Sequence, residues 1–397
     1  MRTKGTIAIL TGGGDVPGLN PAIRAVTIRA HRDGYRVLGI RRGWGGLVDV
    51  VPDAEADNSA AVIELTPEVV RKVGRSGGTF LHSSRVRPSH LARAFIPAHL
   101  QDRYREETND ITPEILRNIE FLGIDTLIAI GGDDTLSYAH RLHVDGANVI
   151  AIPKTMDNDV PGTDYCIGFS TCVTRTIELT HRLRTSAGSH ERILVIEVFG
   201  RYAGYTALVP AMAGASDRCV IPESPFDVER LTELLVSDRS LNPSHYSVVL
   251  VSEGATMTGH DEMTFSDSEA DPYGHKKLGG IGDRVAAAVG ELSSKYNNGR
   301  EVHTTSQRLG YLVRSGDPDA LDSIVPMAFG NLALDLVEEG KSGLLVAVRN
   351  GVYDSVPIEA VVGEKKAVDL DQFYSVDRMR PLYTTFANKP LFIMTSA

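Results

Sequence analysis

Cysteines and long apolar runs are scarce in this chain of 397 residues. The three cysteines, Cys166, Cys172 and Cys219, are odd in number and show no CxxC spacing. They therefore exclude a disulfide framework and a zinc site, and they indicate reduced thiols. No apolar run is long enough to span a membrane, and the N-terminal run Thr6–Thr11 is too short for the core of a signal peptide. These observations predict a cytoplasmic protein.

An excess of positive charge is absent as well. The chain carries 41 Lys and Arg residues against 51 Asp and Glu residues, which gives a formal net charge of −10. Such a protein is poorly suited to bind nucleic acid or an anionic membrane over a broad surface, so any anion site must be local. No internal repeat, low-complexity tract or Pro/Ser-rich linker is found. A chain of this length can form two domains, and without a linker we expect them to be interleaved.

The chain does contain a series of short apolar runs, each ending in a glycine-rich or polar loop. Their β-branched, non-alternating character is typical of strands that are buried on both faces. The predicted strands are Thr6–Leu10, Thr126–Ile130, Val149–Ile152, Ile193–Val198, Ser247–Val251 and Leu344–Val348. The predicted helices are Pro21–His31, Thr112–Phe121, Thr171–Arg184 and Asp283–Tyr296. We expect Asn20 and Thr112 to be the N-caps of the first two helices.

Strands that alternate with helices predict an α/β fold with parallel sheets. Ligands of such folds bind beyond the carboxyl ends of the strands. The stretch Thr256–Gly282 is polar, acidic and rich in glycine, and it predicts a long surface loop inside one domain.

Two glycine-rich loops follow predicted strands. The first, Thr11–Asn20, contains three consecutive glycines before a helix, where backbone N–H groups and the helix N-terminus favour an anion. It lacks the Gly-Lys-Ser/Thr of a P-loop and the GxGxxG of a dinucleotide-binding turn. The second, Gly131–Thr135, places Asp133 and Asp134 after two glycines, and a carboxylate there suits Mg²⁺ with bound phosphate oxygens.

A third loop, Pro153–Asp159, is acidic and also follows a strand. It combines the ammonium of Lys154 with the carboxylates of Asp157 and Asp159, which can act as a base and as support for a metal. Each of the three loops alone is compatible with an ordinary turn. Their occurrence together within the first 160 residues predicts a shared site for a metal-bound polyphosphate.

These loops and several later motifs resemble the phosphofructokinase family. The later motifs follow the family's order: Arg75–Arg85 (RSGGTFLHSSR), Pro161–Phe169 (PGTDYCIGF), Ser189–Arg192 (SHER), Val195–Gly204 (VIEVFGRYAG), Glu253 within VSEG, and Gly310–Gly316 (GYLVRSG). Motifs of this length and order are specific, whereas a lone GGD is also found in lipid kinases and NAD kinases. The resemblance covers most of the chain.

The resemblance implies two interleaved three-layer α/β domains with mainly parallel sheets and an active site in the cleft between them. Residues 1–168 plus about 313–363 would bind the phosphoryl donor and the metal. Residues from about 169 to 312 plus 364–397 would bind the sugar phosphate.

The resemblance also implies a glycolytic kinase that phosphorylates the C1 hydroxyl of fructose 6-phosphate with Mg²⁺ as cofactor. Asp157 would take the hydroxyl proton, Asp133 would bind Mg²⁺, and Asp159 would support the metal or the base. Lys154 and Thr155 would stabilise the transferred phosphoryl group. The donor would be held by Gly13, Gly14, Arg85, Gly132 and Asp134.

Arginines would bind the sugar phosphate, because a planar guanidinium suits a phosphate group. Arg192, Arg201 and Arg314 match the family's positions for this role. Arg192 reaches the site from a neighbouring subunit in the family, so a homodimer or homotetramer with shared sites is implied. The resemblance further assigns Glu253 to the sugar hydroxyls, and it assigns the pocket wall to Met156, Phe199 and Gly200.

Two positions depart from the family's pattern in the last third of the chain. Tyr311 stands where the family usually has histidine, and a tyrosine can still donate one hydrogen bond. Thr305 stands where an arginine is expected, and Arg308 is a candidate to replace it.

Residues 134 and 154 bear on the phosphoryl donor. ATP-using relatives typically have glycine at both positions, which leaves room for the α-phosphate and the ribose. Here both residues are charged, as in the pyrophosphate-dependent branch. A carboxylate about 4 Å from an α-phosphate would repel it by about 4 kcal/mol at an effective dielectric of about 20, or roughly three decades in affinity. Some ATP-using relatives carry lysine at the second position, so Asp134 is the more diagnostic of the two.

We therefore expect a reversible enzyme that transfers a phosphoryl group from pyrophosphate to fructose 6-phosphate, serving glycolysis and gluconeogenesis. In the main alternative, Asp134 is a further Mg²⁺ ligand that pairs with Lys154, and the protein is an ATP-dependent 6-phosphofructokinase. A remote alternative is a sugar-phosphate or nucleotide sensor without catalysis. A sensor predicts a damaged base or metal site, whereas Asp133, Asp157 and Arg192 are all present.

Overall fold

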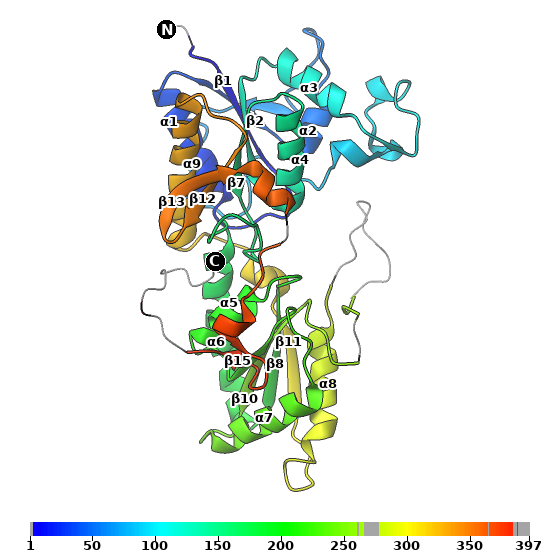
Figure 1. The fold of residues 1–397 in the computed structure, drawn as a ribbon, viewed down its shortest axis with the longest axis vertical. Helices are drawn as coiled ribbons and strands as arrows, with labels where there is room; N and C mark the ends of the chain where they lie inside the picture. The colour runs from blue at the N-terminus through cyan, green and yellow to red at the C-terminus, as the bar shows by residue number, and fades with distance from the viewer. Residues whose placement is uncertain (1–2, 260–261, 266–277, 364, 384–386, 388–397) are drawn as a thin grey trace. The chain divides into compact units, whose positions relative to one another are not determined.

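The computed structural model describes residues 3–259, 262–265, 278–363, 365–383 and 387. The chain divides into two compact, interleaved units (Figure 1). Unit 1 comprises Met1–Thr155, Val160–Gly168 and Ser315–Glu364, and unit 2 comprises Met156–Asp159, Phe169–Arg314 and Lys365–Ala397. The short segment Met156–Asp159 therefore belongs to unit 2, whereas the sequence placed it within the first domain.

Unit 1 is built on a seven-stranded sheet. In sheet order its strands are β13 (Val352–Pro357), β12 (Leu344–Arg349), β7 (Val149–Pro153), β6 (Thr126–Gly131), β1 (Thr6–Thr11), β2 (Arg36–Ile40) and β3 (Val62–Glu64). The five central strands are parallel, and the edge strands β3 and β13 run antiparallel to their neighbours. The central register aligns Ile7 with Thr126 and Leu127 with Val149. The carboxyl ends of β1, β6 and β7 consequently meet at one edge of the sheet.

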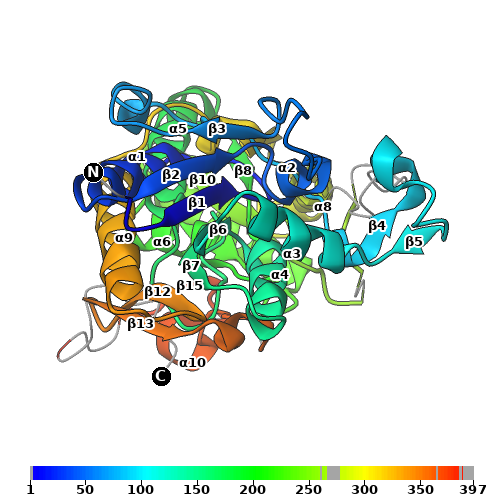
Figure 2. The same cartoon turned by 90° about the horizontal axis from the view of Figure 1, so that it is seen from above.

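Helices cover both faces of this sheet, as Figure 2 shows. On one side α1 (Leu19–Arg32) packs against α9 (Leu321–Glu338), and on the other lie α2 (Trp44–Asp49), α3 (Thr112–Phe121) and α4 (Asp133–Val144). Ala8 and Leu10 of β1 join the cluster that includes the α3 and α4 side chains, while Ile7 and Ile9 point the other way and are equally buried. Burial on both faces explains why the strands are apolar at successive positions.

Short elements complete unit 1. They are η1 (Val73–Arg75), η2 (Pro88–His90), β4 (Leu91–Ala92), η3 (Arg93–Phe95), η4 (Ala98–Leu100), β5 (Thr108–Asn109) and η6 (Ile358–Val362).

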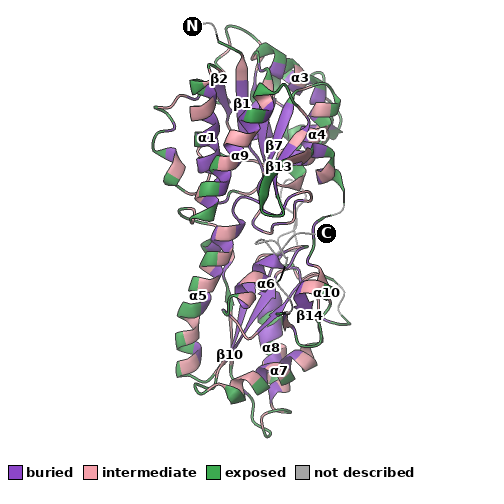
Figure 3. Cartoon of the chain, turned by 60° about the vertical axis from the view of Figure 1, so that its left-hand side comes forward, coloured by how far each residue is buried: buried purple, intermediate pink, exposed green. Residues whose placement is uncertain are grey.

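Unit 2 contains a smaller, all-parallel sheet. In sheet order its strands are β11 (Thr304–Arg308), β8 (Ile193–Val198), β10 (Ser247–Ser252) and β9 (Arg218–Val220). On one face α7 (Val228–Leu241) and α8 (Ile281–Ser293) share an apolar core with the strands, while α5 (Phe169–Ser189) and α6 (Tyr205–Met212) contact the other face. Figure 3 shows the buried strands inside each unit and the exposed outer sides of the helices. The remaining elements are η5 (Gly310–Val313), α10 (Leu370–Phe373), β14 (Tyr374–Ser375) and β15 (Arg380–Pro381).

The six predicted strands and four predicted helices are confirmed, with shifted ends. The predicted N-caps are wrong. Asn20 lies inside α1, where its amide Nδ2 donates to the Ser76 carbonyl at 3.1 Å and its Oδ1 accepts from Phe80 N at 2.7 Å. The carboxylate of Asp110, rather than Thr112, accepts the backbone N–H at the start of α3, at 2.9 Å. Asparagine is a common N-cap residue, but its side chain can equally form hydrogen bonds to a loop that is distant in the sequence, as Asn20 does here.

The predicted surface loop Thr256–Gly282 includes residues 260–261 and 266–277, which lie outside the described residues. Its described ends are packed, because Met257 is 8% exposed and Leu278 is 2% exposed.

All three cysteines lie in the described ranges, where they are buried and form no disulfide. Within the same ranges, no helix has both the length and the apolar character needed to cross a membrane.

Candidate active site

The residues expected to form the site fall into two groups, one on each unit. The glycine loop after β1, the Gly131–Thr135 loop, Lys154 and Thr155 belong to unit 1. Met156–Asp159 and the cationic candidates for sugar-phosphate binding belong to unit 2.

In unit 1 the glycine loop is fixed against its neighbours by close backbone contacts. Gly13 N donates to Ser84 O at 2.9 Å, and Gly13 has a φ of 77°, which glycine adopts without strain. A Cβ at either Gly12 or Gly131 would clash with Thr135. The two glycines therefore let the loops that follow β1 and β6 approach the same threonine.

Lys154 follows β7 and directs its ammonium at the glycine loop. Its Nζ donates to Gly14 O at 2.7 Å and lies 3.3 Å from the place that a Cβ on Gly13 would take. The residue is 4% exposed. A buried ammonium is stable only among acceptors or anions, and Gly14 O is one such acceptor here.

The helix α4 begins with two carboxylates. Asp134 N donates to Asp133 Oδ1 at 2.9 Å, and the positive end of the helix dipole favours negative charge there. The Asp134 side chain is 51% exposed, and its Oδ1 accepts from Arg87 Nη2 at 2.5 Å. Arg87 was not predicted, although Arg85 was. Because alternate residues of an extended segment share one side, the two-residue spacing from Arg85 could have identified it.

Asp133 offers the hard oxygen ligand that Mg²⁺ prefers. Across the part of the chain that the structure describes, no three His, Cys, Asp or Glu side chains converge as a metal cage. Mg²⁺ commonly binds through one or two carboxylates together with phosphate and water oxygens. Asp133, next to a glycine pair at a helix N-terminus, fits that kind of Mg²⁺–phosphate ligand.

In unit 2, Asp157 is a carboxyl group with a strongly raised pKa. Burial raises the pKa of Asp157 to about 8, the carboxylates of Asp159 and Glu253 add to the rise, and Arg201 opposes it. Arg201 N donates to Asp157 Oδ2 at 3.2 Å. Asn158, with a φ of 56°, turns the chain between the two aspartates, a conformation that asparagine tolerates. A carboxyl group with a pKa this close to neutrality suits a general base.

Arg314 lies among aromatic rings. Its guanidinium carbon is 5.8 Å from the ring centroid of Phe199 and 5.5 Å from that of Tyr311, which are cation–π distances. Tyr311 is 67% exposed and presents a ring face to the guanidinium. Burial raises the pKa of the nearby Glu253 to about 7, and the charges of Arg201 and Arg314 lower it.

The other two arginines that the sequence proposed for sugar-phosphate binding have different surroundings. Arg192 Nη1 donates to Thr305 Oγ1 at 3.4 Å, so Arg192 contacts the residue that stands where the family's pattern has an arginine. Arg308, the candidate replacement, is held by the protein itself: its Nε lies 2.9 Å from Oε1 of the buried Glu197, and its Nη2 donates to Leu278 O.

The remaining candidates lie in the same loops. Gly200 has a φ of 119°, and a Cβ there would stand 2.9 Å from Ala203 O, so the turn before Arg201 requires glycine. Met156 is buried, Gly14, Gly132, Thr155 and Asp159 are partly buried, and Arg85 is exposed.

Sequence reasoning also missed Lys366 and Glu223, which hold these loops from behind. Lys366 is 5% exposed, and its backbone N donates to Asp159 O at 3.2 Å. The half-buried Glu223 accepts from Gly204 N at 2.9 Å and from Val368 N at 2.8 Å with the same carboxylate oxygen. Neither residue lies in a motif that could have revealed it.

The comparisons with known proteins agree on one family. The family model described as phosphofructokinase matches residues 6–337. The chain is 36% identical over 387 residues to the pyrophosphate–fructose 6-phosphate 1-phosphotransferase of Dictyoglomus thermophilum, covering 98% of this chain and 100% of that protein. It is also 36% identical over 363 residues to the ATP-dependent 6-phosphofructokinase 3 of Streptomyces coelicolor, covering 91% of this chain and 96% of that protein.

Among solved structures, the phosphofructokinase of Saccharomyces cerevisiae matches with a TM-score of 0.71 at 25% identity. The match covers 90% of this chain and 45% of that chain, so the present chain spans less than half of the yeast one. The relatives include both donor types at the same identity, and they therefore establish the family without selecting the donor. The chain belongs to the phosphofructokinase family.

Proposed function

We propose that this protein transfers a phosphoryl group from pyrophosphate to the C1 hydroxyl of fructose 6-phosphate in a reversible, Mg²⁺-dependent reaction. The products would be fructose 1,6-bisphosphate and phosphate. The single observation that carries the choice of donor is the carboxylate of Asp134, which directly follows Asp133 after the glycine pair and is held by Arg87.

The Asp134–Arg87 pair excludes an α-phosphate partly by charge and partly by volume. An unpaired carboxylate would repel the α-phosphate by about 4 kcal/mol at about 4 Å. Arg87 compensates part of the Asp134 charge, so the repulsion of an α-phosphate is smaller than this value. The two side chains would also exclude the α-phosphate by filling the space that it needs. Lys154 strengthens the argument, because it fills the space beside Gly13 and offers a cation to a donor that has no adenine to anchor it.

Unit 1 would hold the donor. The backbone of Gly13, Gly14 and Gly132 and the side chain of Arg85 would contact pyrophosphate oxygens. Lys154 and Thr155 would stabilise the phosphoryl group as it moves. Asp133 would hold Mg²⁺, which when bound would neutralise charge on the phosphoryl oxygens.

Unit 2 would hold the acceptor. Asp157, with a pKa raised to about 8, would take the proton of the C1 hydroxyl, and Asp159 helps to keep that pKa high. Glu253 would orient the sugar hydroxyls, while Met156, Phe199 and Gly200 would form the pocket wall.

The sugar phosphate would be bound by Arg192, Arg201 and Arg314, whose guanidinium groups can each donate two hydrogen bonds to phosphate oxygens. Because the family supplies the equivalent of Arg192 across a subunit boundary, we propose a cytoplasmic homodimer or homotetramer with shared sites. Arg308 contributes to this binding only if it leaves Glu197.

A second candidate function is ATP-dependent phosphorylation of the same sugar. It is favoured by the ion pair between Asp134 and Arg87, which weakens repulsion of a nucleotide, and by the ATP-dependent relative from Streptomyces coelicolor. Initial rates with pyrophosphate, ATP or ADP, each with fructose 6-phosphate and Mg²⁺, separate the two. Robust turnover with ATP and none with pyrophosphate would overturn the proposal.

A further inference from the structure

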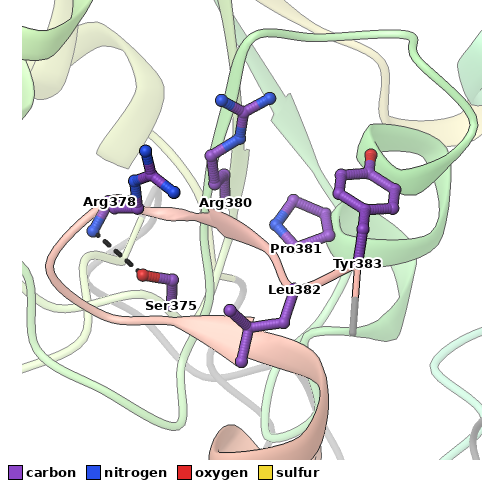
Figure 4. A pocket seen from close by; sticks show the side chains of 6 residues that line it. All are labelled: Ser375, Arg378, Arg380, Pro381, Leu382 and Tyr383. Atoms are coloured by element: carbon purple, nitrogen blue, oxygen red, sulfur yellow. Dashed lines mark hydrogen bonds between the residues drawn. The ribbon is translucent and has the colours of Figure 1, made fainter. Parts of the chain in front are cut away.

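A cavity in unit 2 is lined by none of the residues assigned to the reaction. Its volume is about 370 Å³, which lies within the range of roughly 300–1,000 Å³ typical of small-molecule sites. The lining comes from the β14–β15 hairpin and the two residues after it (Figure 4): Ser375, Arg378, Arg380, Pro381, Leu382 and Tyr383.

Two arginines of this lining are less closely paired with acids than their neighbour Arg218, as far as the described part of the chain shows. Among those residues, neither the Arg378 nor the Arg380 guanidinium forms an ion pair or hydrogen bond; Arg378 bonds only through its backbone. The neighbouring Arg218 contrasts with them, because Asp238 accepts from its Nε at 2.6 Å and from its Nη2 at 2.7 Å. Two guanidinium groups that form no ion pair with a described residue therefore line one cavity of a protein whose net charge is −10.

One acid that interacts with Arg380 is Asp217: burial raises the pKa of its carboxyl group overall, although the charge of Arg380 lowers it. Its Oδ2 accepts from Val248 N at 2.8 Å, so the carboxylate is directed at the sheet. Asp377 also lies in the hairpin and is 3.7 Å from Arg230. Neither acid forms an ion pair with Arg378 or Arg380, although Asp217 offsets part of the Arg380 charge.

The hairpin is held firmly against β9. Cys219 N donates to Met379 O at 2.9 Å, and Tyr374 OH donates to Cys219 O at 2.8 Å. Arg218 Nη1 donates to Arg378 O at 2.6 Å. Because the lining is fixed before any ligand arrives, binding requires little further ordering of the backbone.

We propose that this cavity binds a small phosphate ester. The two guanidinium groups supply the positive charge and the planar sets of N–H donors to which phosphate oxygens bind. Ser375 accepts from Arg378 N at 3.3 Å and retains its hydroxyl hydrogen for a phosphate oxygen. Pro381 and Tyr383 provide an apolar wall for the organic part of the ester. The inference goes beyond the proposed reaction and does not depend on it.

The test uses a reporter placed in the cavity wall of the full-length protein. Tyr383→Trp should give a saturable fluorescence change when phenyl phosphate is added, and wild type should not. Adding Arg378→Ala and Arg380→Ala to the reporter protein should weaken binding by about tenfold or more per guanidinium. Phenyl phosphate should also bind more tightly than benzoate, which carries one negative charge.

Three controls separate this site from other effects. The double variant Arg71→Ala with Arg300→Ala changes net charge equally through exposed arginines outside the cavity, and it should leave the affinity unchanged. Arg378→Lys with Arg380→Lys should retain weakened binding, because lysine keeps the charge without the planar fork. Arg192→Ala should leave the fluorescence change of the Tyr383→Trp reporter intact, which distinguishes the cavity from the proposed sugar-phosphate site.

A crystal soaked in phenyl phosphate gives a second, independent measurement. The phosphate should lie within hydrogen-bonding distance of both guanidinium groups. The proposal is overturned if the reporter shows no saturable change, if the signal persists after both arginines become alanine, or if the soaked crystal holds no ligand in the cavity.

Discussion

The two units place their polar groups in different ways. In unit 1 the loops after β1 and β6 are held together by backbone hydrogen bonds, and the glycines at 12 and 131 let both loops approach Thr135. In unit 2 the candidate site rests on half-buried side chains whose charges act on one another, above all Asp157, Glu253 and Arg201. Backbone groups do not ionise near neutral pH, whereas the carboxyl groups of such a cluster gain or lose protons there. Donor choice should therefore respond to side-chain volume, and turnover should respond to pH.

The largest effect is expected from removing the carboxyl group of Asp157 in unit 2, whose pKa is raised. Asp157→Asn keeps the hydrogen bond from Arg201 N but cannot take a proton, so kcat should fall by about 10²–10⁴-fold. Steady-state kinetics with the better donor measures it. Asp217→Asn is a matched control, because Asp217 is another half-buried acid of unit 2 with a raised pKa, and it should leave kcat unchanged. Wild-type kcat in Asp157→Asn would refute the assignment of the base.

The next largest effect is expected at the proposed donor site of unit 1. Changing Asp134 and Lys154 together to glycine should reduce pyrophosphate turnover by about 10²-fold or more, since a cation and the pair with Arg87 are both lost. Use of ATP should rise by up to roughly three decades, the limit set by removing an unpaired carboxylate. Rates with each donor give the result. Asp49→Gly, which removes another exposed carboxylate paired with an arginine, is the control, and unchanged pyrophosphate kinetics in the double variant would contradict the role of the pair.

The pH dependence sharpens the comparison further. A base must be deprotonated, and the pKa of Asp157 is raised to about 8, so kcat/KM should rise about tenfold per pH unit below 8 and level off above it. For stability the sign is opposite. The folded pKa exceeds the unfolded value of about 3.9, so the stabilising contribution of the protonated group is present below pH 4 and is lost as pH rises toward 8.

The rise of kcat/KM with pH below 8 should be missing from the residual activity of Asp157→Asn. A pH-independent rate between pH 6 and 8 in the wild type would show that Asp157 is already ionised throughout that range, contrary to the expected behaviour.

The smallest effect concerns the position where unit 2 lacks a cation. Thr305→Arg adds a guanidinium beside Arg192, so KM for fructose 6-phosphate should fall by about tenfold with little change in kcat. Thr305→Lys should have a weaker effect, because a point charge binds phosphate without the bidentate geometry. An increase in KM with both variants would place the sugar phosphate elsewhere.

The strands of unit 1 were predictable because burial on both faces leaves runs of β-branched residues, as in Thr6–Leu10 and Val149–Ile152. The polar edge strand β11 was not, since Thr304–Arg308 has no apolar signal and owes its conformation to pairing with β8. In the site, motif residues such as Asp133 and Asp157 could be named from the chain. Arg87 and Lys366 could not be assigned their contacts, because these depend on tertiary neighbours.

The contact between Gly13 and Lys154 also constrains how the protein can evolve. A side chain at position 13 would meet the lysine ammonium, so this glycine is required twice, by its φ of 77° and by the lysine. Replacing Lys154 with glycine removes one of these constraints, and only afterwards can position 13 accept a residue such as asparagine that tolerates the left-handed conformation. Substitutions at the two positions are therefore epistatic, and their order determines which mutational paths remain open.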